Sequence, residues 1–229
     1  MKAYSLFPTL ICEEFYDDKE NFKQIFLENA FQHITNGESG ELSGNVDVHL
    51  NPAFQNFFEF VAQNAKQFVS VLEIDPEIFH FSLVKTWLNI TRESDNPAHD
   101  HSDSHLSFTY YVNVPEDIHK NFVVYCPHEI NSLYYGMLQF NVREYNQFNS
   151  ANHQLLTEEG KLLLFPSRLR HSVTSVDHLN PILKPETKVE TVEQLKNKRI
   201  SIAGDFMLTH KNKTSQFLGL QPIKNWKTY

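Results

Sequence analysis

Four side chains able to bind a metal alternate along seven residues near the middle of the chain: His99, His101, Asp103 and His105. In an extended segment, side chains two residues apart project to the same face, so this spacing would bring imidazoles and a carboxylate together. Such ligands suit iron, zinc, copper or nickel. Histidine and aspartate are also common in surface loops, and Asn96-Pro97 favours a loop at a strand end, so the run alone leaves both interpretations open.

His171 offers a partner from a distant part of the chain. It follows Lys161-Leu-Leu-Leu-Phe-Pro166, a run typical of a buried strand, and precedes a second β-rich run that begins at Ser172. A histidine just past a strand end lies where the mouth of a barrel collects ligands, and sheet pairing can bring strands far apart in sequence side by side. The sequence therefore predicts a metal site between the His99–His101 segment and His171.

The elements that must position these residues are mostly strands. After Pro76 the chain consists of short β-rich runs separated by Pro, Asn, Asp and Gly, which is typical of a two-sheet jelly roll. The expected strands are Phe79–Ile90, Leu106–Val114, Phe122–Tyr125, Met137–Val142, Lys161–Phe165, Ser172–Val176 and Arg199–Leu208. The polar segment 177–198 holds two prolines, so we expect an insert there with one helical turn at Val192–Lys196.

Two helices are expected ahead of the strands. Apolar residues spaced by three and four predict the first over Asp18–Ile34. Asn51-Pro52 offers an N-cap and a first-turn proline for the second, which should run to about Leu72 with a phenylalanine-rich face that packs on the sheet. We therefore predict a mainly β fold with N-terminal helices, as one domain over 1–229: a helical flank (1–76), a jelly-roll core (77–210) and a C-terminal tail (211–229).

Composition limits the possible partners. Twenty Lys and Arg against 28 Asp and Glu give a formal net charge of −8, which repels nucleic acid and anionic lipid. The sequence lacks a run of about 18 apolar residues that could span a bilayer, and its first residues are too short and polar for a signal peptide. Two cysteines, Cys12 and Cys126, are far below the density of a secreted disulfide scaffold. We expect a cytoplasmic protein without a nucleic-acid or membrane partner.

Several motifs, taken in order, resemble a family of 2-oxoglutarate- and Fe(II)-dependent oxygenases. The family pattern His-x-His-Pro-x-Ser-x-Leu-Ser-Gly-x-Tyr-Tyr-Val is matched by His99-Asp-His-Ser-Asp-Ser-His-Leu-Ser-Phe-Thr-Tyr-Tyr-Val112. Further matching pieces are Leu6-Phe7-Pro8-Thr9, Trp87-Leu-Asn89, Gly136-Met-Leu-Gln-Phe140, Gly160-Lys-Leu-Leu-Leu-Phe-Pro-Ser-Arg-Leu-Arg-His171-Ser-Val173 and Arg199-Ile-Ser-Ile-Ala203. The matches span nearly the whole chain, and together they are specific.

The resemblance implies a double-stranded β-helix that binds Fe(II), with 2-oxoglutarate and O2 as co-substrates and open coordination positions on the metal. It places Arg199 at the far carboxylate of 2-oxoglutarate, where a guanidinium can form two parallel hydrogen bonds. Ser201, on the same face of the strand, can add a third. Tyr110 or Tyr111 could bond the same carboxylate, and alternation does not choose between them.

The chain departs from the family pattern in ways that affect the site. Ser102 and Phe108 replace the usual Pro and Gly, and Phe108 could narrow the substrate pocket. Related oxygenases usually show His-x-Asp or His-x-Glu, and two alignments compete here. In one, His99 is the first ligand and His101 takes the carboxylate position; in the other, His101-Ser-Asp103 is the His-x-Asp motif. We prefer His99 as first ligand and keep Asp103 as the alternative carboxylate.

Two other functions use the same features. A cupin-like metalloenzyme, such as an isomerase or hydrolase, would bind zinc or manganese at the histidines and would not need Arg199 and Ser201. A non-catalytic jelly-roll binding protein would carry the histidines in a surface loop. The shared fold does not decide between these functions, so the residues of the site must.

Overall fold

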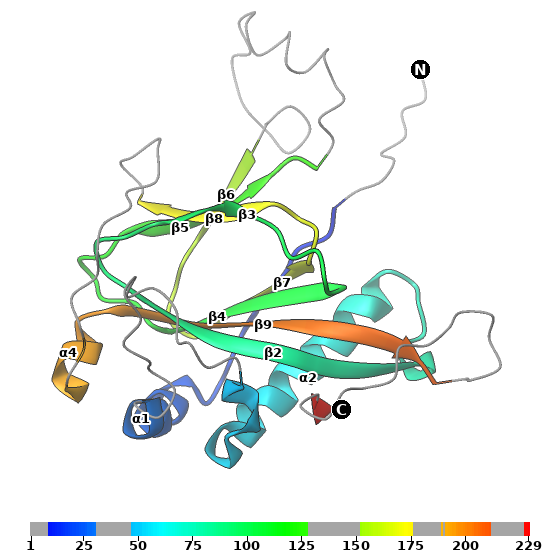
Figure 1. Cartoon of the computed structure of the whole chain (residues 1–229), viewed down its shortest axis with the longest axis horizontal. Helices are drawn as coiled ribbons and strands as arrows, with labels where there is room; N and C mark the ends of the chain where they lie inside the picture. Colours follow the sequence, from blue (N-terminus) through cyan, green and yellow to red (C-terminus); the bar gives the residue numbers. More distant parts are fainter. Residues whose placement is uncertain (1–8, 31–46, 128–151, 176–188, 190, 212–226) are drawn as a thin grey trace, which may run out of the picture.

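Two antiparallel sheets face each other in the computed structural model, which describes residues 9–30, 47–127, 152–175, 189, 191–211 and 227–229 (Figure 1). The six-stranded sheet has the order β1 (Cys12–Phe15), β7 (Lys161–Pro166), β4 (Leu106–Asn113), β9 (Arg199–His210), β2 (Phe79–Thr91) and β10 (Lys227–Thr228). The four-stranded sheet has the order β3 (Asn96–His99), β8 (His171–Ser175), β5 (Lys120–Tyr125) and β6 (Asn152–Leu156). The predicted mainly β jelly-roll class is confirmed.

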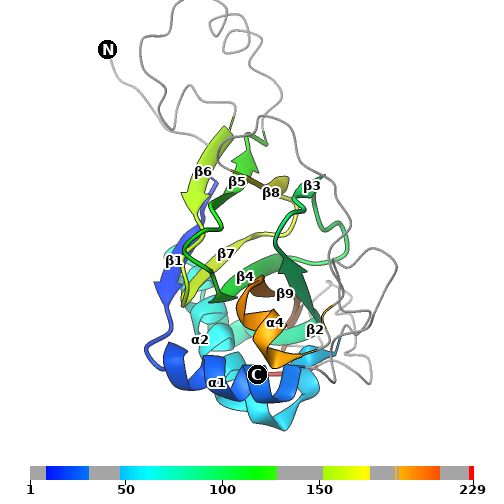
Figure 2. The same ribbon diagram turned by 90° about the vertical axis from the view of Figure 1, so that its left-hand side faces the viewer.

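The helices cover the face of the six-stranded sheet that points away from the four-stranded sheet (Figure 2). They are α1 (Lys19–Asn29), α2 (Gln55–Val71) and the short α4 (Val192–Lys196), with single 3-10 turns at Val48–Leu50, Pro52–Phe54 and Pro76–Ile78. The predicted phenylalanine face is part of the core: the rings of Phe22 and Phe57 stack with centroids 4.3 Å apart, and Tyr110 of β4 lies 4.6 Å from Phe57. Within the described residues, none of the helices is long and apolar enough to cross a membrane.

Alternation along the central strands separates an apolar layer from a polar one. On β9, Ile200, Ile202 and Phe206 join the core beneath the helices. The odd-numbered residues of the strand, which include Arg199 and Asp205, project into the space between the sheets, and both of these are buried. Every residue of β4 is buried as well, because helices cover one face of the sheet and the second sheet covers the other.

Most expected elements are present, with shifted ends. Six of the seven expected strands appear as β2, β4, β5, β7, β8 and β9, while Met137–Val142 lies outside the described residues. The first helix ends at Asn29, and residues 31–34 of its expected range also lie outside the described part. The predicted helical turn at Val192–Lys196 is confirmed, and Thr191 and Gln194 form a capping box that begins it.

Four strands were not predicted: β1, β3, β6 and β10. β3 corrects the prediction that Asn96-Pro97 lies in a loop. Proline cannot donate a hydrogen bond to a neighbouring strand, but β3 is the edge of its sheet, and it pairs with β8 at Asn96 and His99 on either side of a register shift. A strand this short leaves no alternating pattern in the sequence.

Phe108 does not narrow the space between the sheets, contrary to the sequence-based expectation. Its side chain lies in the core beneath the helices, with its ring centroid 6.1 Å from that of Phe206. It pairs across the strands with Gly204, and a Cβ atom at Gly204 would lie only 2.6 Å from Cε1 of Phe108 and from Cγ2 of Thr86. The glycine missing at position 108 is therefore matched by a glycine on the neighbouring strand, which makes room for the larger ring.

We expect Gly204→Ala to destabilise the fold by about 1–3 kcal/mol, the usual cost of adding a methyl group to a filled core. Chemical denaturation monitored by circular dichroism measures this change. The loss should be smaller when Phe108→Leu is already present, because part of the clash is with the phenyl ring. Wild-type stability of Gly204→Ala would show that the core has space that these contacts do not reveal.

Candidate metal centre

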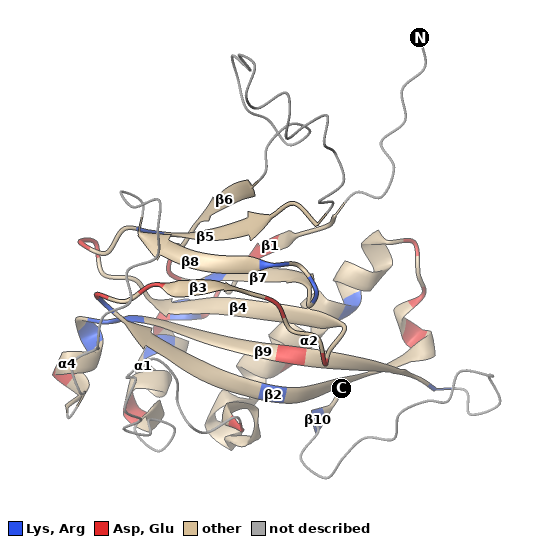
Figure 3. Ribbon diagram, turned by 45° about the horizontal axis from the view of Figure 1, so that its top comes forward, with Lys and Arg blue, Asp and Glu red and all other residues tan. Residues whose placement is uncertain are grey.

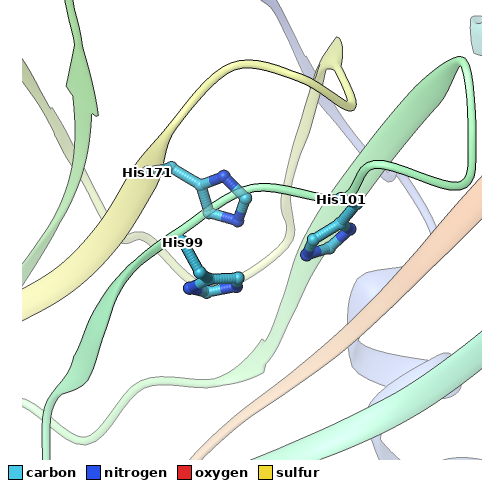
Figure 4. A group of neighbouring side chains, drawn as sticks. All are labelled: His99, His101 and His171. Atoms are coloured by element: carbon cyan, nitrogen blue, oxygen red, sulfur yellow. The ribbon is translucent and has the colours of Figure 1, made fainter.

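Three of the histidines singled out in the sequence lie together between the two sheets. His99 ends β3, His101 follows two residues later, and His171 begins β8, where it is the direct antiparallel partner of His99. Each offers one ligand atom, and these atoms all lie within 4.8 Å of one another. Figure 4 shows the three rings pointing toward one another. The fold thus brings two distant parts of the sequence into one group that could hold a metal ion.

The hydrogen bonds of the rings determine which nitrogen is available. Nδ1 of His99 lies 2.8 Å from the carbonyl oxygen of Pro97, and Nδ1 of His171 lies 2.8 Å from that of Leu169. Nδ1 of His101 lies 2.7 Å from Oδ1 of Asp205. Because carbonyl and carboxylate oxygens accept, each Nδ1 carries the proton and donates it. The lone pair of each Nε2 is therefore free to bind a metal.

His171 is held neutral by its surroundings. Its ring is buried between Phe122 and Phe165, whose centroids lie 5.2 and 4.8 Å away. Burial is the main cause that lowers the pKa of His171, to about 4. Because a metal binds the neutral imidazole, this ligand would need no deprotonation at neutral pH.

Asp205 was missed by the sequence analysis. It is fully buried on β9, where its Oδ1 bonds His101 and accepts a hydrogen bond of 2.6 Å from Oγ of Ser107. Its Oδ2 forms an ion pair of 3.0 Å with Lys85. Burial would raise the pKa of Asp205, but the bonds to His101 and Ser107 and the charge of Lys85 outweigh it and hold the pKa below its usual value. The sequence signal was the spacing Arg199, Ser201, Asp205, which puts an acid on the inward face of a strand.

The structure does not bring Asp103 to the three histidines. Its carboxylate is largely exposed and binds Nζ of Lys85 at 3.1–3.2 Å. His105, the last member of the alternating run, accepts a hydrogen bond from the backbone N–H of Leu208. The expected shared face of this run is therefore wrong beyond His101, because β3 ends at His99 and the following residues form a turn.

Arg199 is a buried cation that forms no ion pair with a carboxylate among the described residues. Its side chain is 1% exposed at the start of β9, and its guanidinium carbon lies 4.9 Å from the ring centroid of Tyr111. Among the described residues, Nε and Nη1 of Arg199 and the hydroxyl of Tyr111 have no hydrogen-bond partner. Burial lowers the pKa of Arg199, yet a guanidinium remains charged in proteins.

The two tyrosines of β4 point in opposite directions. Tyr111 pairs with Ser201 and lies in the cluster between the sheets, where burial raises its pKa to about 12. Tyr110 packs beneath the helices against Phe22 and Phe57, and burial raises its pKa as well. Both therefore stay protonated at neutral pH, but of the two only Tyr111 faces Arg199.

The arrangement combines two chemical functions inside one pair of sheets. Three imidazoles can hold a divalent metal and leave coordination positions for other ligands. A buried arginine with unpaired N–H groups can bind a carboxylate. A small acid that chelates the metal at one end and carries a carboxylate at the other would satisfy both.

Comparison with known proteins agrees with this chemistry. The model of the family described as "Putative 2OG-Fe(II) oxygenase" matches residues 85–180, which include all three histidines. No curated protein matches the chain. Among solved structures, the 2-oxoglutarate (alpha ketoglutarate) dependent carbocyclase SnoK from nogalamycin biosynthesis has a TM-score of 0.57 at 8% identity, covering 96% of this chain and 92% of its own.

Two further solved structures share the fold. The prolyl-4-hydroxylase of Pseudomonas putida has a TM-score of 0.50 at 11% identity, covering 87% of this chain and 92% of its own. EctD from S. alaskensis, solved with 2-oxoglutarate and 5-hydroxyectoine, has a TM-score of 0.51 at 11% identity, covering 93% of this chain and 80% of its own. At these identities the likeness concerns the fold alone.

We expect purified protein to bind about one Fe(II) per chain, and His171→Ala to lose that binding, because the histidine joins β8 to the group. Metal content after anaerobic loading and desalting is the measurement. Asp103→Ala is the matched control: it removes a possible ligand that lies outside the group and should retain iron. Equal iron content in wild type, His171→Ala and a His99→Ala, His101→Ala double variant would overturn the site.

Proposed function

We propose that His99, His101 and His171 hold an Fe(II) ion and that Arg199 anchors 2-oxoglutarate; the match of residues 85–180 to the "Putative 2OG-Fe(II) oxygenase" family model supports this proposal. The enzyme class and the co-substrates follow from the family: it is a 2-oxoglutarate-dependent dioxygenase that consumes O2. The proposal adds the residues and the reaction type, which we take to be hydroxylation.

Arg199 is the single observation that carries the proposal. Burying a charge without a partner costs several kcal/mol, so proteins pair such charges or use them to bind a ligand. The Nε and Nη1 atoms of Arg199, which have no hydrogen-bond partner among the described residues, are the kind of donors that a carboxylate needs. A cupin-like metalloenzyme without an oxoacid has no use for this cation, and a non-catalytic binding protein has no use for three inward-facing imidazoles.

Each residue has a distinct task. The three Nε2 atoms bind the metal, and the hydrogen bonds at Nδ1 fix the ring orientations. Arg199 and Ser201 bind the far carboxylate of 2-oxoglutarate, and the protonated hydroxyl of Tyr111 donates to the same carboxylate. When bound, the iron and 2-oxoglutarate supply the oxidising chemistry, in which 2-oxoglutarate is decarboxylated to succinate while the substrate is oxidised.

The substrate end of the site faces outward. His99 is exposed, whereas His171 and Arg199 are buried, so the co-substrate occupies the interior and the substrate approaches from the side of His99. Trp87 of β2 lies beside His101, with the two ring centroids 5.4 Å apart, and Lys85 of the same strand forms an ion pair with Asp205. An aromatic and a charged side chain therefore lie next to the proposed metal ligands.

The cellular setting and the domain organisation are part of the proposal. Two cysteines in the whole chain suit a reducing compartment, which supports a cytoplasmic enzyme. The helical flank packs directly on the sheet that carries Arg199, and this shared core supports the single oxygenase domain expected over 1–229.

We expect iron-loaded protein to convert 2-oxoglutarate slowly to succinate even without its substrate, because the residues proposed to bind the metal and the co-substrate all lie between the same two sheets. Succinate release and oxygen uptake give the readout, with His171→Ala as the inactive control. Iron-loaded protein that forms no succinate, and gives no heat on titration with 2-oxoglutarate, would support the cupin-like alternative instead.

Substitutions at Arg199 should weaken 2-oxoglutarate binding in a fixed order. Arg199→Lys keeps the charge but loses the two-pronged contact, and Arg199→Ala loses both. Losing a charge-assisted hydrogen bond costs about 1.5–3 kcal/mol, so Arg199→Ala should bind at least about 10-fold more weakly by calorimetry. Iron binding should survive in both variants.

Arg92→Ala is the matched control for this series. Arg92 lies next to Thr91, the strand partner of Arg199, but its partly exposed guanidinium is paired with Asp117. Its removal takes away the same charge and should leave 2-oxoglutarate affinity unchanged. Wild-type affinity in Arg199→Ala, with the fold intact by circular dichroism, would show that the anchor is another residue.

A further inference from the structure

Asp205 is a buried carboxylate in direct contact with the histidine group. It is 0% exposed and lies on β9, six residues after Arg199, on the same inward face. Its bond to His101 distinguishes that histidine from the other two, whose Nδ1 atoms donate to neutral backbone carbonyls two residues earlier in the chain. His101 alone has a charged partner.

The hydrogen bond from His101 to Asp205 matters because of the position that His101 holds among the proposed metal ligands. His101 occupies the position that holds a carboxylate in the usual His-x-Asp arrangement, so in the proposed site all three protein ligands would be imidazoles and none would carry a negative charge. A carboxylate hydrogen-bonded to the far nitrogen of an imidazole makes the ring a stronger donor and fixes its orientation. Asp205 is bonded in this way to Nδ1 of His101.

We propose that Asp205 is a positioning residue that acts through His101 and supplies to the metal centre the negative charge that its direct ligands lack. The inference rests on the proposed metal site. Ser107 donates its hydroxyl hydrogen to the same oxygen of Asp205 and can accept a hydrogen bond from Oγ of Ser167, 2.9 Å away, so the carboxylate is held in place from β4 and from the turn after β7. His101 is thereby fixed although it lies outside any strand.

The positive charge of Lys85 opposes the effect of the Asp205 carboxylate on His101. It pairs across the strands with Asp205, and Figure 3 shows the basic position on β2 beside the acidic position on β9. Its ammonium contacts Oδ2 of Asp205, while His101 and Ser107 contact Oδ1. Lys85 also binds the exposed Asp103. The cation makes burial of Asp205 less costly but reduces the negative charge felt at His101.

An alternative role is purely structural, as a cross-strand ion pair between β2 and β9. The two roles predict opposite results for Lys85. If Asp205 serves only as partner of Lys85, removing either residue should have similar effects on the fold and none specific to the metal. If Asp205 acts through His101, losing its charge weakens metal binding, whereas losing the charge of Lys85 does not.

The test compares Asp205→Asn, Lys85→Met and the control Asp103→Asn in the full-length chain. Anaerobic Fe(II) affinity, measured by competition with a chromophoric chelator, should fall about 10–100-fold in Asp205→Asn, the usual effect of removing such a partner. Asp103→Asn should bind as wild type, and Lys85→Met should bind at least as tightly. Asparagine keeps the size of the side chain, and circular dichroism reports whether each variant is folded.

A second measurement, by NMR, detects the hydrogen bond between His101 and Asp205 directly. In Zn(II)-loaded, 15N-labelled protein, the Nδ1–H signal of His101 should show a strong hydrogen bond to a carboxylate, and Asp205→Asn should shift that signal while leaving those of His99 and His171 in place. Wild type that binds no metal would refute the proposed site itself. Wild type that binds Fe(II), with Asp205→Asn binding equally tightly or its histidine signals unshifted, would refute only the role of Asp205.

Discussion

The antiparallel pairing of β9 between β2 and β4 keeps both halves of the candidate site in register. Arg199 lies at the beginning of this strand and Asp205 six residues later, and strict alternation sends both into the space between the sheets. A shift of one residue would turn Ile200 and Phe206 into that space and bury the charges beneath the helices. The large apolar surface under α1 and α2 therefore fixes the position of the polar site on the opposite face.

The polar interior has an energetic cost that the apolar layer offsets. Arg199, Asp205 and His171 are buried polar groups, and each would be more stable in water than in an apolar core. Asp205 recovers part of this cost through His101, Ser107 and Lys85. Arg199 contacts the Tyr111 ring, but among the described residues its Nε and Nη1 atoms have no hydrogen-bond partner. A ligand that pairs with Arg199 should therefore stabilise the fold as well as occupy the site.

Much of the architecture could be predicted because it depends on local patterns. Long strands such as β2 and β9 show their apolar runs in the sequence, and the spacing of phenylalanines predicted α2. Short edge strands such as β3 could not be predicted, because their pairing is decided by the partner strand. The pair His99 and His171 was predicted from strand ends, and the assignment of these side chains as ligands stays a prediction that metal binding must test.

Contacts that depend on three-dimensional neighbours were beyond the sequence. Alternation left Tyr110 and Tyr111 equivalent, and only the packing of Tyr110 against Phe22 and Phe57 separates them. Asp103 seemed a ligand by its spacing, but the turn after His99 directs it to Lys85. Phe108 seemed to face the site, and the glycine that accommodates it lies 96 positions away in the sequence, at Gly204 (204 − 108 = 96).

The donor set alone does not select iron, because imidazole binds zinc, copper and nickel as well. Selection of one metal over another in such a site must come from the ligands that fill the open coordination positions. The residues around Arg199, which are proposed to bind the co-substrate, are therefore important for this selection. If Arg199 anchors the co-substrate as proposed, it would fix the orientation in which the acid meets the metal, and the metal would need open positions for both the acid and oxygen. In the proposed site, the buried arginine would therefore influence the choice of metal as well as the binding of the acid, without contacting the metal.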